Sequence, residues 1–207
     1  MHRPIALLWA ALEVRLRAYR HVNCSLRDEG VRRALDRLQG EPEFESSITP
    51  EVGELIYMLT LTRRAALIVE FGGLVGYSTI YLASALADLG SGQLITTELD
   101  LGRADRIREN LADAGVAQRV DVRPGDAMLT LQDLAAPIDL LFLDGLNDLY
   151  LPLLQALEPH LEDHAVVVAD LSSKEPLSAY RAYVTDPLNG YASVTVGLDD
   201  GVLVSVR

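Results

Sequence analysis

A glycine-rich turn links a buried apolar run to a helix, and its residue types could hold a nucleotide-like ligand. The run 66–71 is typical of a buried strand, and apolar residues at helical spacing follow from Ser78 to Leu89. Three glycines, Gly72, Gly73 and Gly76, lie in the turn. Because glycines carry no side chain, backbone N–H groups at the helix N-terminus can approach a polar ligand closely.

The charged residues around this turn indicate which kind of ligand it could hold. Glu70 precedes the glycines in an E-x-G-x-x-x-G spacing, which differs from the G-x-G-x-x-G that a dinucleotide pyrophosphate prefers. A carboxylate there would repel a pyrophosphate but suit a cation. A second apolar run, 93–97, ends at Glu98, where a carboxylate can accept hydrogen bonds from a ribose. We therefore favour a ribose-bearing cofactor with a positive group over a dinucleotide, and either over an empty turn.

The elements that must position these residues alternate along the chain. We expect strands near 66–71, 93–98, 120–124, 138–143, 165–170, 191–196 and 202–206. Helical patterns separate the first five, which predicts a parallel sheet covered by helices on both faces. The last two are joined through Asp199-Asp200-Gly201, a hairpin signal. The sequence thus predicts an α/β, Rossmann-like, doubly wound, mostly parallel seven-stranded sheet with a terminal antiparallel hairpin.

The segment before the first strand has a helical pattern. One helical face is expected within 4–22, another around Leu35 after a possible cap at Ser25, and a third helix after Thr49 and Pro50. We expect one domain, 1–207, with a helical N-terminal arm at 1–62 and a cofactor-binding core at 63–207.

Composition excludes several classes of function. The net charge of −12 over 207 residues argues against binding nucleic acid, whose phosphates would be repelled. The sequence has no apolar run long enough to span a bilayer, so we expect no membrane partner. Cys24 is the only cysteine, which fits a reducing cytoplasm and leaves no intramolecular disulfide.

Acidic residues gather where the predicted strands end. They are Glu70, Glu98, Asp126, Asp144 and Asp170. In an open α/β sheet the ligand crevice lies outside the carboxyl ends of the strands. Carboxylates meeting there repel one another unless a cation or hydrogen-bond donors balance them, which favours a positively charged ligand. Each aspartate alone is equally compatible with a helix cap.

In combination these motifs resemble class I S-adenosylmethionine (SAM)-dependent O-methyltransferases, in the catechol and caffeoyl-CoA O-methyltransferase-like branch. The resemblance runs from about Ile48 to the C-terminus. It rests on Val69-Glu70-Phe71-Gly72, Gly76-Tyr77-Ser78, Thr97-Glu98-Leu99-Asp100, Gly125-Asp126-Ala127, Phe142-Leu143-Asp144-Gly145 and Val168-Ala169-Asp170. It implies SAM as the cofactor, a small-molecule acceptor methylated at oxygen, and N-terminal helices that close over the acceptor or build a homodimer.

The resemblance also implies roles for single residues. The implied cofactor-binding set is Glu70, Gly72, Gly73, Gly76, Tyr77, Ser78, Glu98, Leu99, Gly125, Asp126, Ala127 and Asp144. Within it, Glu70, Gly72 and Ser78 would surround the methionine portion, Glu98 would accept both ribose hydroxyls, and Asp126 would accept from the adenine amine. Asp144 and Asp170 would be catalytic, with Asp144 near the sulfonium and the acceptor.

Two positions depart from the metal-dependent members of that branch. Those relatives carry a lysine where this chain has Asn147, and an asparagine where it has Leu171. Leucine cannot coordinate a cation, and magnesium-type ions want about six oxygen donors. We therefore expect no tightly bound catalytic metal. Lys174 could replace the missing base, although a surface charge is its ordinary role.

Other interpretations remain open at this point. The chain could bind the cofactor without transferring methyl, as a non-methylating catalyst or ligand-binding module. A nicotinamide-dependent dehydrogenase is disfavoured by the glycine spacing. His160 and His164 are spaced like a zinc pair but are more consistent with surface residues. Four tyrosines could line an aromatic acceptor pocket or simply pack in the core: Tyr150, Tyr180, Tyr183 and Tyr191.

Overall fold

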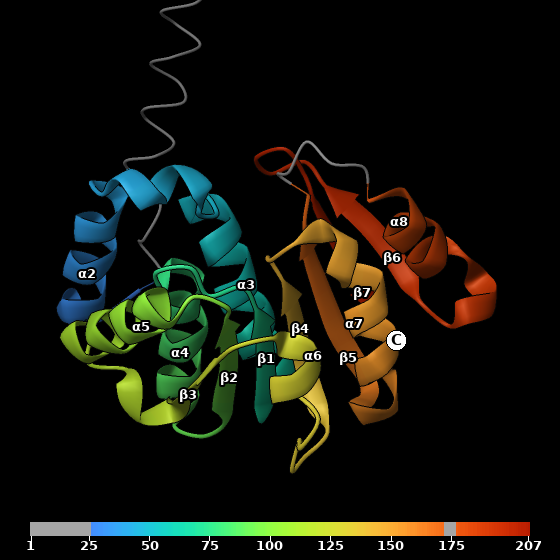
Figure 1. Ribbon diagram of the computed structural model, residues 1–207, viewed down its shortest axis with the longest axis horizontal. Coiled ribbons are helices and arrows are strands. Elements are labelled where there is room, and N and C mark those ends of the chain that lie inside the picture. Colours follow the sequence, from blue (N-terminus) through green and yellow to red (C-terminus); the bar gives the residue numbers. More distant parts are fainter. Residues whose placement is uncertain (1–25, 172–176) are drawn as a thin grey trace, which may run out of the picture.

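One mixed sheet organises the chain. The computed structural model describes residues 26–171 and 177–207. Its strands are β1 (Leu67–Phe71), β2 (Gln93–Glu98), β3 (Val120–Pro124), β4 (Ile138–Leu143), β5 (Leu161–Asp170), β6 (Ala192–Val196) and β7 (Val202–Val206). They lie in the order β3-β2-β1-β4-β5-β7-β6 (Figure 1). Strands β1 to β5 pair in parallel, while β7 pairs antiparallel with both β5 and β6, which confirms the predicted sheet and terminal hairpin.

Helices cover both faces of this sheet. They are α2 (Glu29–Gln39), α3 (Pro50–Arg63), α4 (Tyr77–Leu89), α5 (Leu101–Asp113), α6 (Ala127–Thr130), α7 (Tyr150–Leu157) and α8 (Ser178–Thr185), with short 3-10 turns that include η1 (Pro42–Ser46). Helices α2 to α5 share one apolar core with Ile68 and Phe142, and α6 to α8 share another with Val69 and Leu141. Because neighbouring strand residues point to opposite faces, the sheet is doubly wound as predicted.

The N-terminal helices differ from expectation in how they begin. Asp28 caps α2, since its Oδ1 accepts from the backbone N–H of Gly30 at 2.7 Å and of Val31 at 3.1 Å. The expected cap, Ser25, lies outside the described residues, as do the 4–22 helical face, Cys24 and Lys174. Thr49 precedes Pro50 at the start of α3, but its side chain makes no capping hydrogen bond.

Strand β5 begins four residues earlier than predicted, at Leu161. His160 ends a 3-10 turn and His164 is an exposed residue of β5 in the left-handed region, at φ 61°. The two histidines therefore share no helix face, and the surface interpretation holds. Among the described residues, no helix is long and apolar enough to cross a membrane.

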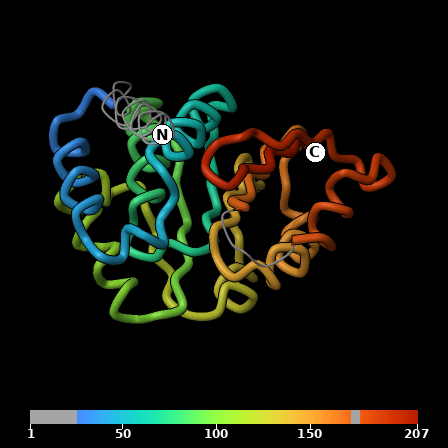
Figure 2. Tube along the Cα trace, turned by 90° about the horizontal axis from the view of Figure 1, so that it is seen from above, coloured from blue at the N-terminus to red at the C-terminus, as the bar shows by residue number. Residues whose placement is uncertain are grey.

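Ionic and aromatic contacts bring the segment before α3 against α4 and α5. Figure 2 shows α2 beside these helices at one end of the molecule and the β6–β7 hairpin at the other. Arg106 on α5 pairs with Glu43 of η1 at 2.9 Å. The ring of Phe44 packs edge-on against Tyr77, with centroids 4.9 Å apart. These contacts place residues 46–48 beside the carboxyl end of the sheet.

Candidate functional site

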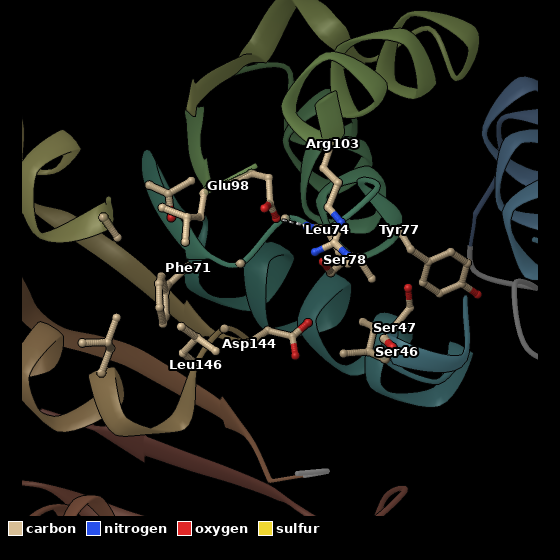
Figure 3. A pocket seen from close by; sticks show the side chains of 18 of the residues that line it. Ser46, Ser47, Phe71, Leu74, Tyr77, Ser78, Glu98, Arg103, Asp144 and Leu146 are labelled. Carbon is tan, nitrogen blue, oxygen red and sulfur yellow. Dashed lines mark hydrogen bonds between the residues drawn. The ribbon is translucent and has the colours of Figure 1, made fainter. Parts of the chain in front are cut away.

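A cavity of about 360 Å³ opens at the carboxyl ends of β1, β2 and β4 (Figure 3). Small-molecule sites typically enclose about 300–1,000 Å³. The sequence-predicted residues that line it are Gly72, Gly73, Tyr77, Ser78, Glu98, Leu99, Gly125, Asp126, Ala127 and Asp144. Glu70, Gly76 and Asp170 belong to the predicted set but do not line it. The motifs thus meet at one edge of the sheet, as an open α/β architecture dictates.

The glycine turn is held tightly between β2 and β4. Gly72 has φ 95°, and a Cβ atom there would lie 2.5 Å from the carbonyl oxygen of Asp144. The N–H groups of Gly72 and Gly73 both donate to the carbonyl of Thr97, at 3.2 and 3.0 Å. Gly76, at φ 92°, begins α4. Only glycine fits the close approach at Gly72, and the turn aims the N-terminus of α4 at the cavity.

Glu98 connects the turn to the next helix. Its side chain is buried at the end of β2, where Oε2 accepts from the N–H of Leu74 and Oε1 from the N–H of Asp100, both at 2.9 Å. Each carboxylate oxygen can accept more than one hydrogen bond. A carboxylate already fixed in orientation by two amides can therefore accept a vicinal diol from the cavity side, which fits a ribose.

Glu70 lies behind the turn rather than in the cavity. It is fully buried, and its Oε2 accepts from the hydroxyl of Thr79 at 2.6 Å. Burial raises its pKa, while the hydroxyls of Ser78, Thr79 and Thr96 act in the opposite direction. This carboxylate braces the first turn of α4 through Thr79 and does not line the cavity, and its implied place around the methionine portion stays a prediction.

The third motif forms the far side of the cavity. The N–H of Gly125 donates to the carbonyl of Glu98 at 2.8 Å. Asp126 caps α6, because its Oδ1 accepts from the N–H of Met128 at 2.9 Å. The same aspartate lines the cavity. Asp126 thus caps a helix and also lies at the cavity wall, so its role as a cap does not exclude the ligand role that the resemblance implies.

Asp144 and Asp170 form a carboxyl pair at the ends of β4 and β5. Asp144 lines the cavity, and its N–H donates to the carbonyl of Phe71 at 2.9 Å. Burial raises the pKa of Asp144 well above its usual range, and the charges of Asp170 and Glu70 raise it further. Asp170 is buried behind it, with its carbonyl accepting from the hydroxyl of Tyr150 at 3.2 Å. Asp144 thus places a carboxyl group with a raised pKa at the cavity wall.

The donor set does not fit a tightly held divalent cation. Leu171 is buried in the apolar core under α7 and α8, and its N–H donates to the carbonyl of Gly201 at 3.0 Å. Within 26–171 and 177–207, no group of three or more histidine, cysteine or acidic side chains could hold a metal ion. Asp144 and Asp170 alone supply too few oxygen donors for a magnesium-type ion.

The tyrosines that could have lined an acceptor pocket pack in the core instead. Tyr150 and Tyr180 are buried edge-to-face, with centroids 5.8 Å apart. Tyr183 and Tyr191 both donate their hydroxyls to Glu158. None of the four lines the cavity.

The cavity also has walls that the sequence motifs did not indicate. They are Ser46, Ser47, Ile48, Phe71, Leu74, Thr97, Arg103, Gly145, Leu146 and Leu149. Three of them, Phe71, Thr97 and Gly145, stand inside the quoted motifs but had no assigned role. Leu74 and Leu146 adjoin motif residues, so extending the motifs by one or two positions would have found them. Ser46, Ser47, Ile48, Arg103 and Leu149 reach the cavity through tertiary packing, for which no motif is a signal.

Comparisons with known proteins agree with this geometry. A family model described as a methyltransferase domain matches residues 69–170. A catechol O-methyltransferase of Niastella koreensis is 37% identical over 103 residues, which cover 48% of this chain and 46% of the relative. The chain thus aligns with about half the length of the curated relatives that it matches.

Two solved structures share the architecture. An O-methyltransferase from Bacillus cereus, solved with SAH (S-adenosylhomocysteine), has a TM-score of 0.75 at 23% identity and covers 92% of this chain and 96% of its own, which shows the shared fold. An O-methyltransferase from Streptomyces achromogenes involved in tomaymycin synthesis, solved with SAM, has a TM-score of 0.68 at 26% identity over 87% of this chain and 90% of its own. The methyltransferase-domain match, the catechol O-methyltransferase relatives and the shared fold together support a class I O-methyltransferase of the catechol and caffeoyl-CoA O-methyltransferase-like branch.

Proposed function

We propose that this chain is a SAM-dependent methyltransferase that methylates a hydroxyl oxygen of a small molecule. The observation that carries the proposal is the single cavity in which the glycine turn, the end of β2, the start of α6 and the end of β4 meet. The O-methyltransferase from Streptomyces achromogenes, which is 26% identical and was solved with SAM, supports the choice of cofactor.

We assign residues of the cavity to each part of that cofactor by the chemistry that they offer. Glu98 accepts the ribose hydroxyls, with its orientation fixed by the amides of Leu74 and Asp100. Leu99 would pack on the adenine, and Asp126 and Ala127, which line the same cavity, would meet its edge. Ser78 and the other amides at the start of α4 receive the methionine portion, because a helix N-terminus attracts a carboxylate.

Catalysis then depends on alignment and on one proton. SAM supplies the methyl group on a positively charged sulfur. The chain holds the acceptor hydroxyl in line with that methyl, which lowers the entropic part of the barrier. Asp144, when ionised, faces the positive charge and takes the hydroxyl proton, a role that its raised pKa suits. Burial, and after it the charge of Asp170, keeps that pKa high.

We propose that this reaction proceeds without a tightly bound metal. The burial of Leu171 among apolar side chains, where metal-dependent relatives have an oxygen ligand, supports this view. Calorimetry with magnesium, calcium and manganese on the cofactor-loaded protein tests it. Micromolar binding that is lost in Asp170→Ala would contradict a metal-free site.

Thermal denaturation with ligands separates the candidate cofactors. A ligand that binds only the folded state raises the melting temperature. We expect SAM and SAH to raise it and NAD to leave it unchanged. Mass spectrometry of catechols and hydroxylated polyketides incubated with SAM should then show the gain of one methyl group. A melting temperature insensitive to both SAM and SAH would refute the proposal.

A second candidate function is cofactor binding without methyl transfer. Asn147 and Leu171 stand where related enzymes carry catalytic side chains, which favours a non-methylating catalyst or ligand-binding module. Stabilisation by SAM with no methylated product, across acceptors that include catechols, would favour this candidate.

We also propose a cytoplasmic homodimer. The single cysteine supports a reducing compartment. Leu188 and Val194, 93% and 61% exposed near the edge strand β6, support a subunit contact. Light scattering coupled to gel filtration measures the mass, and a monomer would contradict the dimer.

A further inference from the structure

Arg103 introduces a positive charge into an otherwise acidic cavity. It lies in the first turn of α5, and its side chain points into the cavity toward Leu74 and Ser78 (Figure 3). The other charged residues that line the cavity are Glu98, Asp126 and Asp144. A cation at that position must therefore match an anionic part of whatever binds.

The guanidinium of Arg103 forms no ion pair in the described part of the chain, although its charge acts on Glu43 from a longer distance. Among the residues that the structure describes, it has no hydrogen-bond acceptor and no acidic partner within 4.0 Å. The two other arginines of α5 differ, because Arg106 pairs with Glu43 at 2.9 Å and Arg108 with Asp105 at 2.7 Å. Arg103 alone on this helix is directed at the ligand space.

The neighbours of Arg103 mark the end of the cavity that suits an anion. Ser78 lies in the first turn of α4, whose N-terminus carries partial positive charge. Ser46 and Ser47, from the end of η1 and just after it, line the same cavity with hydroxyl groups. Within SAM, the methionine carboxylate is the only anion, since the ribose and adenine are neutral and the sulfonium and ammonium are positive.

We propose that Arg103 binds the carboxylate of the methionine portion of SAM, together with Ser78 and the N-terminus of α4. This inference rests on the proposed function. A guanidinium presents paired N–H donors that match a carboxylate in a bidentate manner. Because Arg103 reaches in from α5, it contacts the bound cofactor from the side of the cavity opposite Asp144.

Calorimetry with two ligands tests the pairing. SAH carries the amino-acid portion, whereas methylthioadenosine keeps the nucleoside and the sulfur but lacks the carboxylate. In Arg103→Gln we expect the Kd of SAH to rise about 10-fold, which corresponds to one charge-assisted hydrogen bond, and the Kd of methylthioadenosine to stay within about twofold. Arg103→Lys keeps the positive charge but lacks the paired N–H donors of the guanidinium. The Kd of SAH in this variant should lie between those of the wild type and of Arg103→Gln.

Arg108→Gln is the matched control. It makes the same change of charge on the same helix, at a residue paired with Asp105 outside the cavity, so it should alter neither Kd. Equal weakening of both ligands in Arg103→Gln would overturn the pairing, as would unchanged binding of SAH. Unchanged SAH binding with a raised KM for an anionic acceptor would assign Arg103 to the acceptor instead. Wild-type protein that binds neither ligand would overturn the proposed function along with the pairing.

Discussion

Replacing Glu98 by glutamine tests the residue on which the cofactor assignment most depends. In the wild type, both carboxylate oxygens accept backbone amides at 2.9 Å, one from the glycine turn at Leu74 and one from Asp100 at the start of α5. Glutamine keeps one acceptor and turns the other into an N–H₂ group facing an N–H. One of the two hydrogen bonds must therefore be lost.

The loss of one hydrogen bond sets the expected change in the free energy of unfolding. A hydrogen bond to a charged group contributes about 1.5–3 kcal/mol. The free energy of unfolding should fall by that amount, and a chain of this length loses about 2–4 °C in Tm per kcal/mol, so Tm should drop by about 3–12 °C. If the ribose diol also loses one charge-assisted bond, the Kd of SAH should rise about 10- to 150-fold, at tenfold per 1.4 kcal/mol.

Thermal denaturation and calorimetry with SAH measure the two effects separately. Glu109→Gln on the exposed side of α5 makes the same charge change away from the cavity and should leave both values unchanged. A lowered Tm in Glu98→Gln with a Kd of SAH within threefold of wild type would mean that Glu98 only fixes the turn, and the ribose assignment would be wrong. An unchanged Tm would refute the structural role as well.

Three further perturbations test other parts of the site. Asp144→Asn should abolish methyl transfer yet raise the free energy of unfolding at neutral pH. The pKa of Asp144 is higher in the folded than in the unfolded state, so the stability that this group contributes to the wild type is fully present at low pH and is lost as pH rises through the folded pKa. Urea titrations of the wild type and of Asp144→Asn across pH measure this, and equal pH dependence of the two free energies of unfolding would contradict it. Gly72→Ala should cost more stability than Gly190→Ala, since both glycines have positive φ but only the first Cβ would meet backbone, at 2.5 Å from the carbonyl oxygen of Asp144; equal losses of Tm would remove the argument for close approach. Turnover should survive an excess of EDTA, and activity restored only by magnesium would contradict the metal-free site.

The sequence predicted the sheet well because its signals are local. Apolar runs bounded by turn residues gave the strands, and glycine spacing gave the turn at Gly72 and Gly76, both of which have positive φ. Strand β5 was predicted too short because its first residues, 161–164, are largely exposed and carry no apolar run.

What the sequence could not give depends on contacts between distant residues. All five positions of β1 are buried, so no alternation of polar and apolar residues reveals that Glu70 braces the first turn of α4 and does not line the cavity. Arg103 enters the cavity through the packing of α5, and residues 46–48 reach it because Arg106 holds Glu43, 63 positions away in the chain. The periodicity of apolar residues and the spacing of motifs do not indicate contacts between residues so far apart in the chain.

A crystal structure of the chain grown with SAH tests the central claim most directly. We expect the ribose hydroxyls on Glu98, the adenine beside Leu99 and Asp126, and the methionine carboxylate between Ser78 and Arg103. The ligand bound elsewhere, or a cavity left empty beside Gly72 and Glu98 at saturating SAH, would contradict it.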